Sequence, residues 1–124
     1  MAKQRNEIEE KYTWDLSTIF PTDEAFEAEL AQVSEEVKKA ASLAGHLLDS
    51  ADSLLTTTEV QLDLMCRIEK LYSYAHMKND QDTRVAKYQE YQAKGMTLYS
   101  DFGQSFAFYE PEFMAITEEQ YQAF

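Results

Sequence analysis

The sequence predicts an all-α fold of long antiparallel helices, and three observations support this class. Gly and Pro are scarce, with three glycines and two prolines in 124 residues, whereas β-sandwiches and barrels need many tight turns. Apolar residues recur every three or four positions, which is the period of an amphipathic helix. The length suits one domain with its own core. We expect a three-helix bundle, or a helical hairpin plus a third helix, truncated at the start of a fourth helix.

Residues 1–21 are predicted to form an extended N-terminal arm, and residues 22–124 a helical N-terminal lobe. The chain opens with charged residues, after which Tyr12, Trp14 and Leu16 alternate with polar residues as in an extended strand. No partner strand is evident. We therefore expect the arm to pack its aromatic side chains onto another surface.

The first long helix is predicted from Asp23 to about Leu43. Thr22 or Asp23 can cap its start, and Gly45 is the natural stop signal. Acidic residues follow in the first turn, where they favour the positive end of the helix dipole. One apolar stripe runs along this helix at Phe26, Leu30, Val33, Val37, Ala40 and Ala44.

A second helix is predicted from about Thr58 to Met77 or Lys78, after a connection at residues 46–57. Two overlapping capping boxes, Thr56 with Glu59 and Thr58 with Gln61, mark its start. Its apolar residues cover more than a single stripe. A helix with such a broad apolar face is usually packed between two others, so we expect it to be central.

A third helix is predicted from about Asp82 to Phe108, and Pro111 is expected to end it. Gly95 lies inside this helix at a cost in helix propensity, which suggests the close approach of a neighbouring helix. Thr117 with Gln120 forms another capping box, which indicates the start of a fourth helix.

The charge of the chain argues against two classes of partner. The formal net charge is −12, and such a surface repels nucleic-acid phosphates and anionic lipids. No apolar run approaches the length of a membrane span, and the N-terminus lacks the apolar core of a secretory signal. With a single cysteine, this pattern favours a cytoplasmic protein without disulfides.

Residues able to carry catalysis are few, and we predict no catalytic and no metal-binding residue. Neither His46 nor His76 lies in a His-Glu-x-x-His motif, although a zinc site assembled from both in space is an alternative. His76 is expected to be a partly buried packing residue. Cys66 is expected to be a buried structural cysteine, since it lies in mid-helix without a second cysteine.

The aromatic content is the unusual feature, with eight tyrosines and seven phenylalanines. These side chains can simply fill a core. Alternatively, some of them line a groove for peptide, because Tyr offers a wide contact area at low entropic cost. The candidates for this second role are Tyr74, Tyr91 and Tyr109.

Three stretches occur in an order and spacing that match one enzyme family across nearly the whole chain. They are Tyr12–Phe20 with the acidic start at Asp23–Glu24, Leu71–Ala75 with Asp80–Thr83 and Tyr88–Gln89, and Ser105–Phe106 leading to Glu110–Glu112. Together they resemble the N-terminal region of the oligoendopeptidase F family, zinc metallopeptidases related to thimet oligopeptidase. Gly95, where Ala is expected, and Arg84–Val85 depart from the family pattern.

The resemblance implies a helical lobe that forms one wall of a deep channel for short peptides. In this family the zinc and the glutamate base lie on a His-Glu-x-x-His helix of a later catalytic domain, so no ligand maps to this chain. There, zinc-activated water attacks a peptide carbonyl. The expected partners are that domain and short peptides, and basic peptides would suit the acidic surface.

The alternative function is a standalone helical module with an apolar groove for a partner helix. If the chain is a lobe cut from its parent enzyme, its apolar surfaces lack the cover that the rest of the enzyme would give. We therefore expect the isolated chain to form a two-fold homodimer that strengthens with salt.

Overall fold

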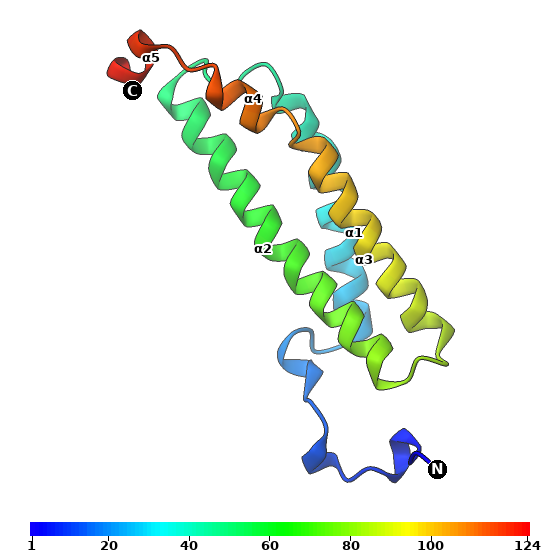
Figure 1. The fold of residues 1–124 in the computed structure, drawn as a ribbon. Coiled ribbons are helices and arrows are strands. Elements are labelled where there is room, and N and C mark those ends of the chain that lie inside the picture. The colour runs from blue at the N-terminus through cyan, green and yellow to red at the C-terminus, as the bar shows by residue number, and fades with distance from the viewer.

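The computed structural model describes all 124 residues and is all-helical, which confirms the predicted fold class. Three long helices form an antiparallel bundle: α1 (Asp23–Ala40), α2 (Ala51–Gln81) and α3 (Ala86–Ser105) (Figure 1). Two short helices, α4 (Tyr109–Met114) and α5 (Glu118–Ala123), follow α3 and lie near the start of α2. The division of the chain at residue 21 stays a prediction.

The ends of α1 lie where the sequence places them. The hydroxyl of Thr22 accepts a hydrogen bond from the backbone N–H of Ala25 at 3.1 Å, which satisfies one of the free donors of the first turn. A single 3₁₀ turn at Ala41–Leu43 extends the helix. Gly45 then adopts φ +84°, a left-handed conformation that glycine adopts without strain, and the chain turns toward α2.

The start of α2 was predicted wrongly, because the helix begins seven residues before Thr58. Ser50 is its N-cap, and the Ser50 hydroxyl accepts from the backbone N–H of Ser53 at 3.0 Å. The threonines of the predicted capping boxes therefore lie inside the helix. Thr58 donates instead to the carbonyl oxygen of Leu54 at 2.7 Å, the usual bond of a threonine within a helix.

Helix α3 is shorter than predicted at both ends. Asp82 takes hydrogen bonds from the backbone N–H and the guanidinium of Arg84, and these bonds hold a turn where the helix was expected to start. At the other end α3 stops at Ser105, before Pro111. Pro111 lies instead in the first turn of α4, where a backbone N–H would lack a helical partner anyway.

The N-terminal arm contains no strand. It forms three single-turn 3₁₀ helices, at Arg5–Glu7, Glu10–Tyr12 and Leu16–Thr18. The side chain of Asp15 accepts from the backbone N–H of Ser17 and starts the last of these turns, which breaks the expected alternation. The arm leaves the bundle at the end where α1 begins (Figure 1).

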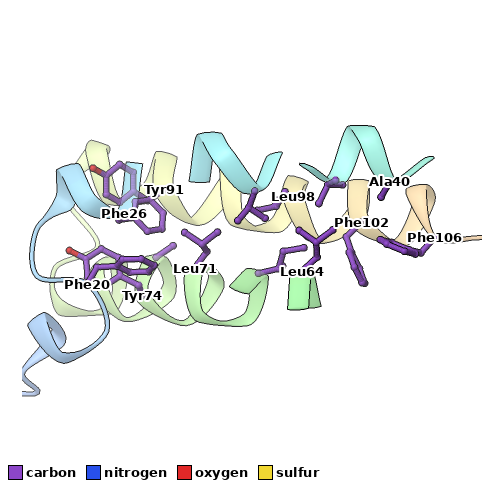
Figure 2. Close-up of a cluster of buried hydrophobic side chains, with 14 of the residues drawn as sticks. Phe20, Phe26, Ala40, Leu64, Leu71, Tyr74, Tyr91, Leu98, Phe102 and Phe106 are labelled. Atoms are coloured by element: carbon purple, nitrogen blue, oxygen red, sulfur yellow. The ribbon is translucent and has the colours of Figure 1, made fainter. Parts of the chain in front are cut away.

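The core runs between the three long helices for most of their length (Figure 2). Aromatic rings fill both ends. Phe26 is fully buried at one end, with the Tyr91 centroid 4.4 Å and the Tyr74 centroid 5.1 Å from its own. At the other end Phe102 and Phe106 contact each other at 4.9 Å. Six of the aromatic side chains thus belong to the buried core, and Tyr88 and Phe108 pack against it.

Gly95 lies where α3 approaches α2, as predicted. A Cβ at Gly95 would come 3.7 Å from the Cα of Tyr72 and 3.8 Å from the Cβ of Ala75, which is ordinary van der Waals contact. We therefore expect Gly95→Ala to raise the free energy of unfolding by about 0.5–1 kcal/mol, the gain in helix propensity. Urea denaturation measures this change. Gly103→Ala is the control, because a Cβ there would meet nothing within 4 Å. A loss of stability at Gly95 alone would show that the helices are too close.

Candidate functional site

The most concentrated group of polar side chains lies where α1 begins. The carboxylate of Asp23 accepts hydrogen bonds from the hydroxyls of Tyr74 (2.7 Å) and Tyr88 (3.0 Å). The Nζ atom of Lys87 lies 3.1 Å from the same carboxylate, and that of Lys78 lies 3.8 Å away. One residue of α1 is thus bound to both helices of the α2–α3 hairpin, close to the turn that joins them.

This Asp23 cluster is a satisfied network. Burial alone would raise the pKa of Asp23, but the hydrogen bonds from Tyr74, Lys87 and Tyr88 and the charge of Lys78 hold it below its ordinary value of 3.8. Burial and the bond to Asp23 raise the pKa of Tyr74. Every charge has a partner, and Tyr74 is buried. The cluster therefore fixes the bundle and does not present a free acid, base or nucleophile.

The Asp23 cluster predicts a definite pH dependence. A lowered carboxyl pKa in the folded state contributes stability above pH 3.8 that is lost as the pH falls below this value. A raised tyrosine pKa contributes stability below pH 10.0 that is lost at higher pH. We expect the difference in unfolding free energy between the native chain and Asp23→Asn to be constant from about pH 5 to 9 and to shrink below about pH 4. A difference that grows on acidification would contradict this account.

A second ionic group joins α1 to α2. The guanidinium of Arg67 donates to Glu29 and to Glu36, each at 2.7 Å, and its side chain is mostly buried. The hydrogen bond to Glu29 is the largest cause of a raised pKa of Arg67, and the bond to Glu36 adds to it. Helix α1 is therefore held against one side of α2 along its middle.

The structure divides the three tyrosines predicted to line a peptide groove. The Tyr74 side chain is 1% exposed and that of Tyr91 is 3% exposed. Both project into the core (Figure 2), and the hydroxyl of Tyr91 donates to Glu27. Their burial leaves almost no surface for a peptide. Tyr74 and Tyr91 therefore fill the core, which was the other role considered for the aromatic side chains.

Tyr109 is the candidate that keeps an exposed surface. It lines a shallow groove of about 680 Å³ between α2 and α4, together with Gln61 and Met114. Its hydroxyl lies 2.7 Å from the Thr58 hydroxyl oxygen, which fixes the ring against α2. Contact of Tyr109 with a peptide stays a prediction.

Glu112 belongs to the third of the stretches on which the family resemblance rests, and it has a structural role here. The carboxylate of Glu112 accepts from the backbone N–H groups of Gly45 and Leu47. These bonds hold α4 on the loop that connects α1 to α2.

The two histidines are far apart and each has its own carboxylate. His46 lies before α2 with its Nδ1 atom 2.8 Å from Asp49, and His76 lies near the end of α2 with its Nε2 atom 3.4 Å from Asp80. From its first residue to His76, α2 runs for roughly 38 Å. No group of three or more His, Cys, Asp or Glu side chains is placed to hold a metal ion. The His76 side chain is 46% exposed and its ring stacks on that of Tyr72, which agrees with the expected partly buried packing residue.

The prediction that Cys66 is buried was wrong, because its side chain is exposed. Helix α2 is packed on one side only, through a stripe that includes Leu64, Ile68 and Leu71. Cys66 lies on the other side, near Leu62 and Met65, which are 55% and 39% exposed. The broad apolar face of α2 was read correctly from the sequence, but half of it has no covering helix in this chain.

Sequence reasoning missed a groove on this open side. It lies between α2 and α3, has a volume of about 600 Å³, and is lined by Glu69, Tyr72, Ser73, Met96, Tyr99 and Ser100. No residue of α1 takes part. The signal in the sequence was the second apolar stripe of α2, which continues on α3 at Met96 and Tyr99. No helix of the chain has both the length and the hydropathy that crossing a bilayer requires.

Comparison with known proteins decides the family. No protein-family model matches the chain. Group B oligopeptidase PepB of Streptococcus agalactiae is 55% identical over all 124 residues, and the plasmid-encoded oligoendopeptidase F of Lactococcus lactis subsp. cremoris is 59% identical over 122 residues. The chain belongs to the oligoendopeptidase F family. The predicted resemblance is thus confirmed.

The likeness to the oligoendopeptidase F family extends to the fold. The crystal structure of oligoendopeptidase-F from Enterococcus faecium matches 82% of this chain with a TM-score of 0.72 and 32% identity. The chain spans about a fifth of the length of its relatives, 21% of the streptococcal protein and 20% of the lactococcal one. It corresponds to the N-terminal part of these peptidases.

Proposed function

We propose that this chain is the non-catalytic N-terminal lobe of a peptidase that hydrolyses short peptides and that it forms part of the wall of the substrate channel. The observation that carries this proposal is identity of 55–59% to oligopeptidases over the whole chain, combined with a span of only a fifth of their length. A helical scaffold without a group of reactive side chains suits a wall that shapes access to a distant active site.

Zinc has no place among the residues of this chain. His46 and His76 lie at opposite ends of α2 and each is paired with a carboxylate, so the side chains present do not fit a zinc site. We propose that the zinc ligands and the general base belong to the remainder of the polypeptide, and that the protein works in the cytoplasm. The role of this chain is to hold a shape.

The contribution of this chain to peptide binding is electrostatic. A third groove, of about 580 Å³, lies between α1 and α3, and Glu27, Glu90 and Asp101 line it beside Lys94. Lys94 is paired with Glu90 at 2.7 Å, which leaves the groove acidic. A wall of this charge favours basic peptides at low salt, and this preference weakens as salt screens the charges.

The proposal is tested by reading the frame beyond Phe124 and by metal analysis. A His-Glu-x-x-His motif downstream supports it, and a stop codon directly after Phe124 would overturn it. The 124-residue chain alone should hold no stoichiometric zinc. About one tightly bound zinc per chain, lost on His46→Ala or His76→Ala, would contradict the proposal.

The second candidate function is a standalone module that binds a partner helix, and the open groove between α2 and α3 favours it. The reading frame separates the two candidates, because a module needs no catalytic domain in the same polypeptide.

A further inference from the structure

The large exposed apolar side chains of the bundle are distributed unevenly. Helix α1 has none, and its exposed residues are charged side chains, two alanines and Gln32. The exposed large apolar side chains of the three long helices lie instead on the surface that α2 and α3 share. We name this surface the outer face, and its residues are Leu55, Leu62, Met65 and Cys66 of α2 and Met96 and Tyr99 of α3.

On α2, the outer face forms a second apolar stripe along the helix rather than a scatter of single residues. Its four members on α2 fall within an arc of roughly 100° on the helix, directly beside the contact with α3. The groove of about 600 Å³ between Tyr72 on α2 and Met96 on α3 continues the same surface. Apolar patches of this kind on a soluble domain mark sites of interaction, and methionines adapt well to such contacts.

We propose that the outer face is the docking surface for the remainder of the same polypeptide, while the charged surface of α1 stays open. This inference rests on the proposed function. The occupant follows from length: relatives with 55–59% identity over this region continue for about four times its length, so a large covalently attached partner is available. Covalent attachment gives that partner a high effective concentration.

A second copy of the chain is the poorer occupant. Each copy carries a net charge of −12, and two such bodies repel each other before apolar contact is made. The homodimer expected for the isolated chain is, on this account, a substitute for the missing cover. It should not persist in the longer protein, where the outer face is already buried.

Cys66 provides a direct probe, because its thiol lies within the outer face. In the longer protein, without peptide, we expect a maleimide to label Cys66 at least about tenfold more slowly than a cysteine introduced by Ala28→Cys on the exposed surface of α1. Peptide mapping by mass spectrometry identifies which cysteine has reacted. Equal labelling rates at the two positions would overturn the inference.

Two further outcomes are equally decisive. Protection of Cys66 only after peptide is added would make the outer face part of the channel and overturn docking. Protection that disappears on dilution would assign the face to a second copy and overturn it as well. The labelling needs no substrate turnover, so an active peptidase with an accessible Cys66 rejects the docking surface and leaves the proposed function intact.

A variant separates docking from folding. Leu62→Asp should speed the labelling of Cys66 in the longer protein toward the rate seen at Ala28→Cys. In the 124-residue chain the same change should leave the denaturation midpoint nearly unchanged, because Leu62 is 55% exposed there. If Leu62→Asp leaves Cys66 protected in the longer protein, the outer face is not the docking surface and the inference is overturned.

Discussion

Phe26→Ala should lower the free energy of unfolding by about 4 kcal/mol, the largest effect expected for a single substitution in this chain. Phe26 is fully buried, and its ring lies among those of Tyr91, Tyr74 and Phe20 at centroid distances of 4.4, 5.1 and 5.7 Å. Alanine would leave a cavity that these rigid rings cannot fill. Urea denaturation followed by far-ultraviolet circular dichroism measures the loss.

Met114→Ala is the matched control for Phe26→Ala, since it also removes a large apolar side chain, but one that is 75% exposed. Its effect should stay within about 0.5 kcal/mol. If Phe26→Ala costs less than about 1 kcal/mol, the aromatic end of the core does not hold the three helices together.

Asp23→Ala should cost about 2–3 kcal/mol, because it leaves the hydroxyls of Tyr74 and Tyr88 without their acceptor and removes the partner of Lys87. The Asp23 side chain is only 16% exposed, so water replaces these bonds incompletely. Chemical denaturation near neutral pH measures the loss.

Glu24→Ala separates the Asp23 network from a general effect of charge. Glu24 lies in the same first turn of α1 and meets the same helix dipole, but its side chain is exposed. We expect it to cost less than about 1 kcal/mol. Equal losses at the two positions would mean that the helix dipole, and not the network, accounts for the stability.

Helix positions could be predicted where the signal is local. The Thr22 cap, the stop at Gly45 and the capping box at Thr117 each depend on residues within four positions, and all three appear in the structure. The start of α2 could not be placed in the same way. Several Ser and Thr residues between Ser50 and Thr58 can each cap a helix, and local sequence does not show that the earliest of them, Ser50, is the cap.

The errors at the candidate site have a different cause. The spacing of apolar residues along α2 shows how wide its apolar face is, but it does not show how many helices cover that face. Cys66 was therefore predicted to be buried, although it is exposed. Similarly, the partners of Tyr74 and Tyr91 are Asp23 and Glu27, which lie 51 and 64 residues away. Such pairs form only when α1 docks on the hairpin.

On the proposed function, this chain serves a peptidase without supplying its chemistry. Hydrolysis of a short basic peptide, followed by mass spectrometry, tests this most directly when the longer protein and the 124-residue chain are compared at equal concentration. The account predicts cleavage by the longer protein and none by the chain alone. Cleavage by the 124-residue chain, or no cleavage by the longer protein, would contradict it.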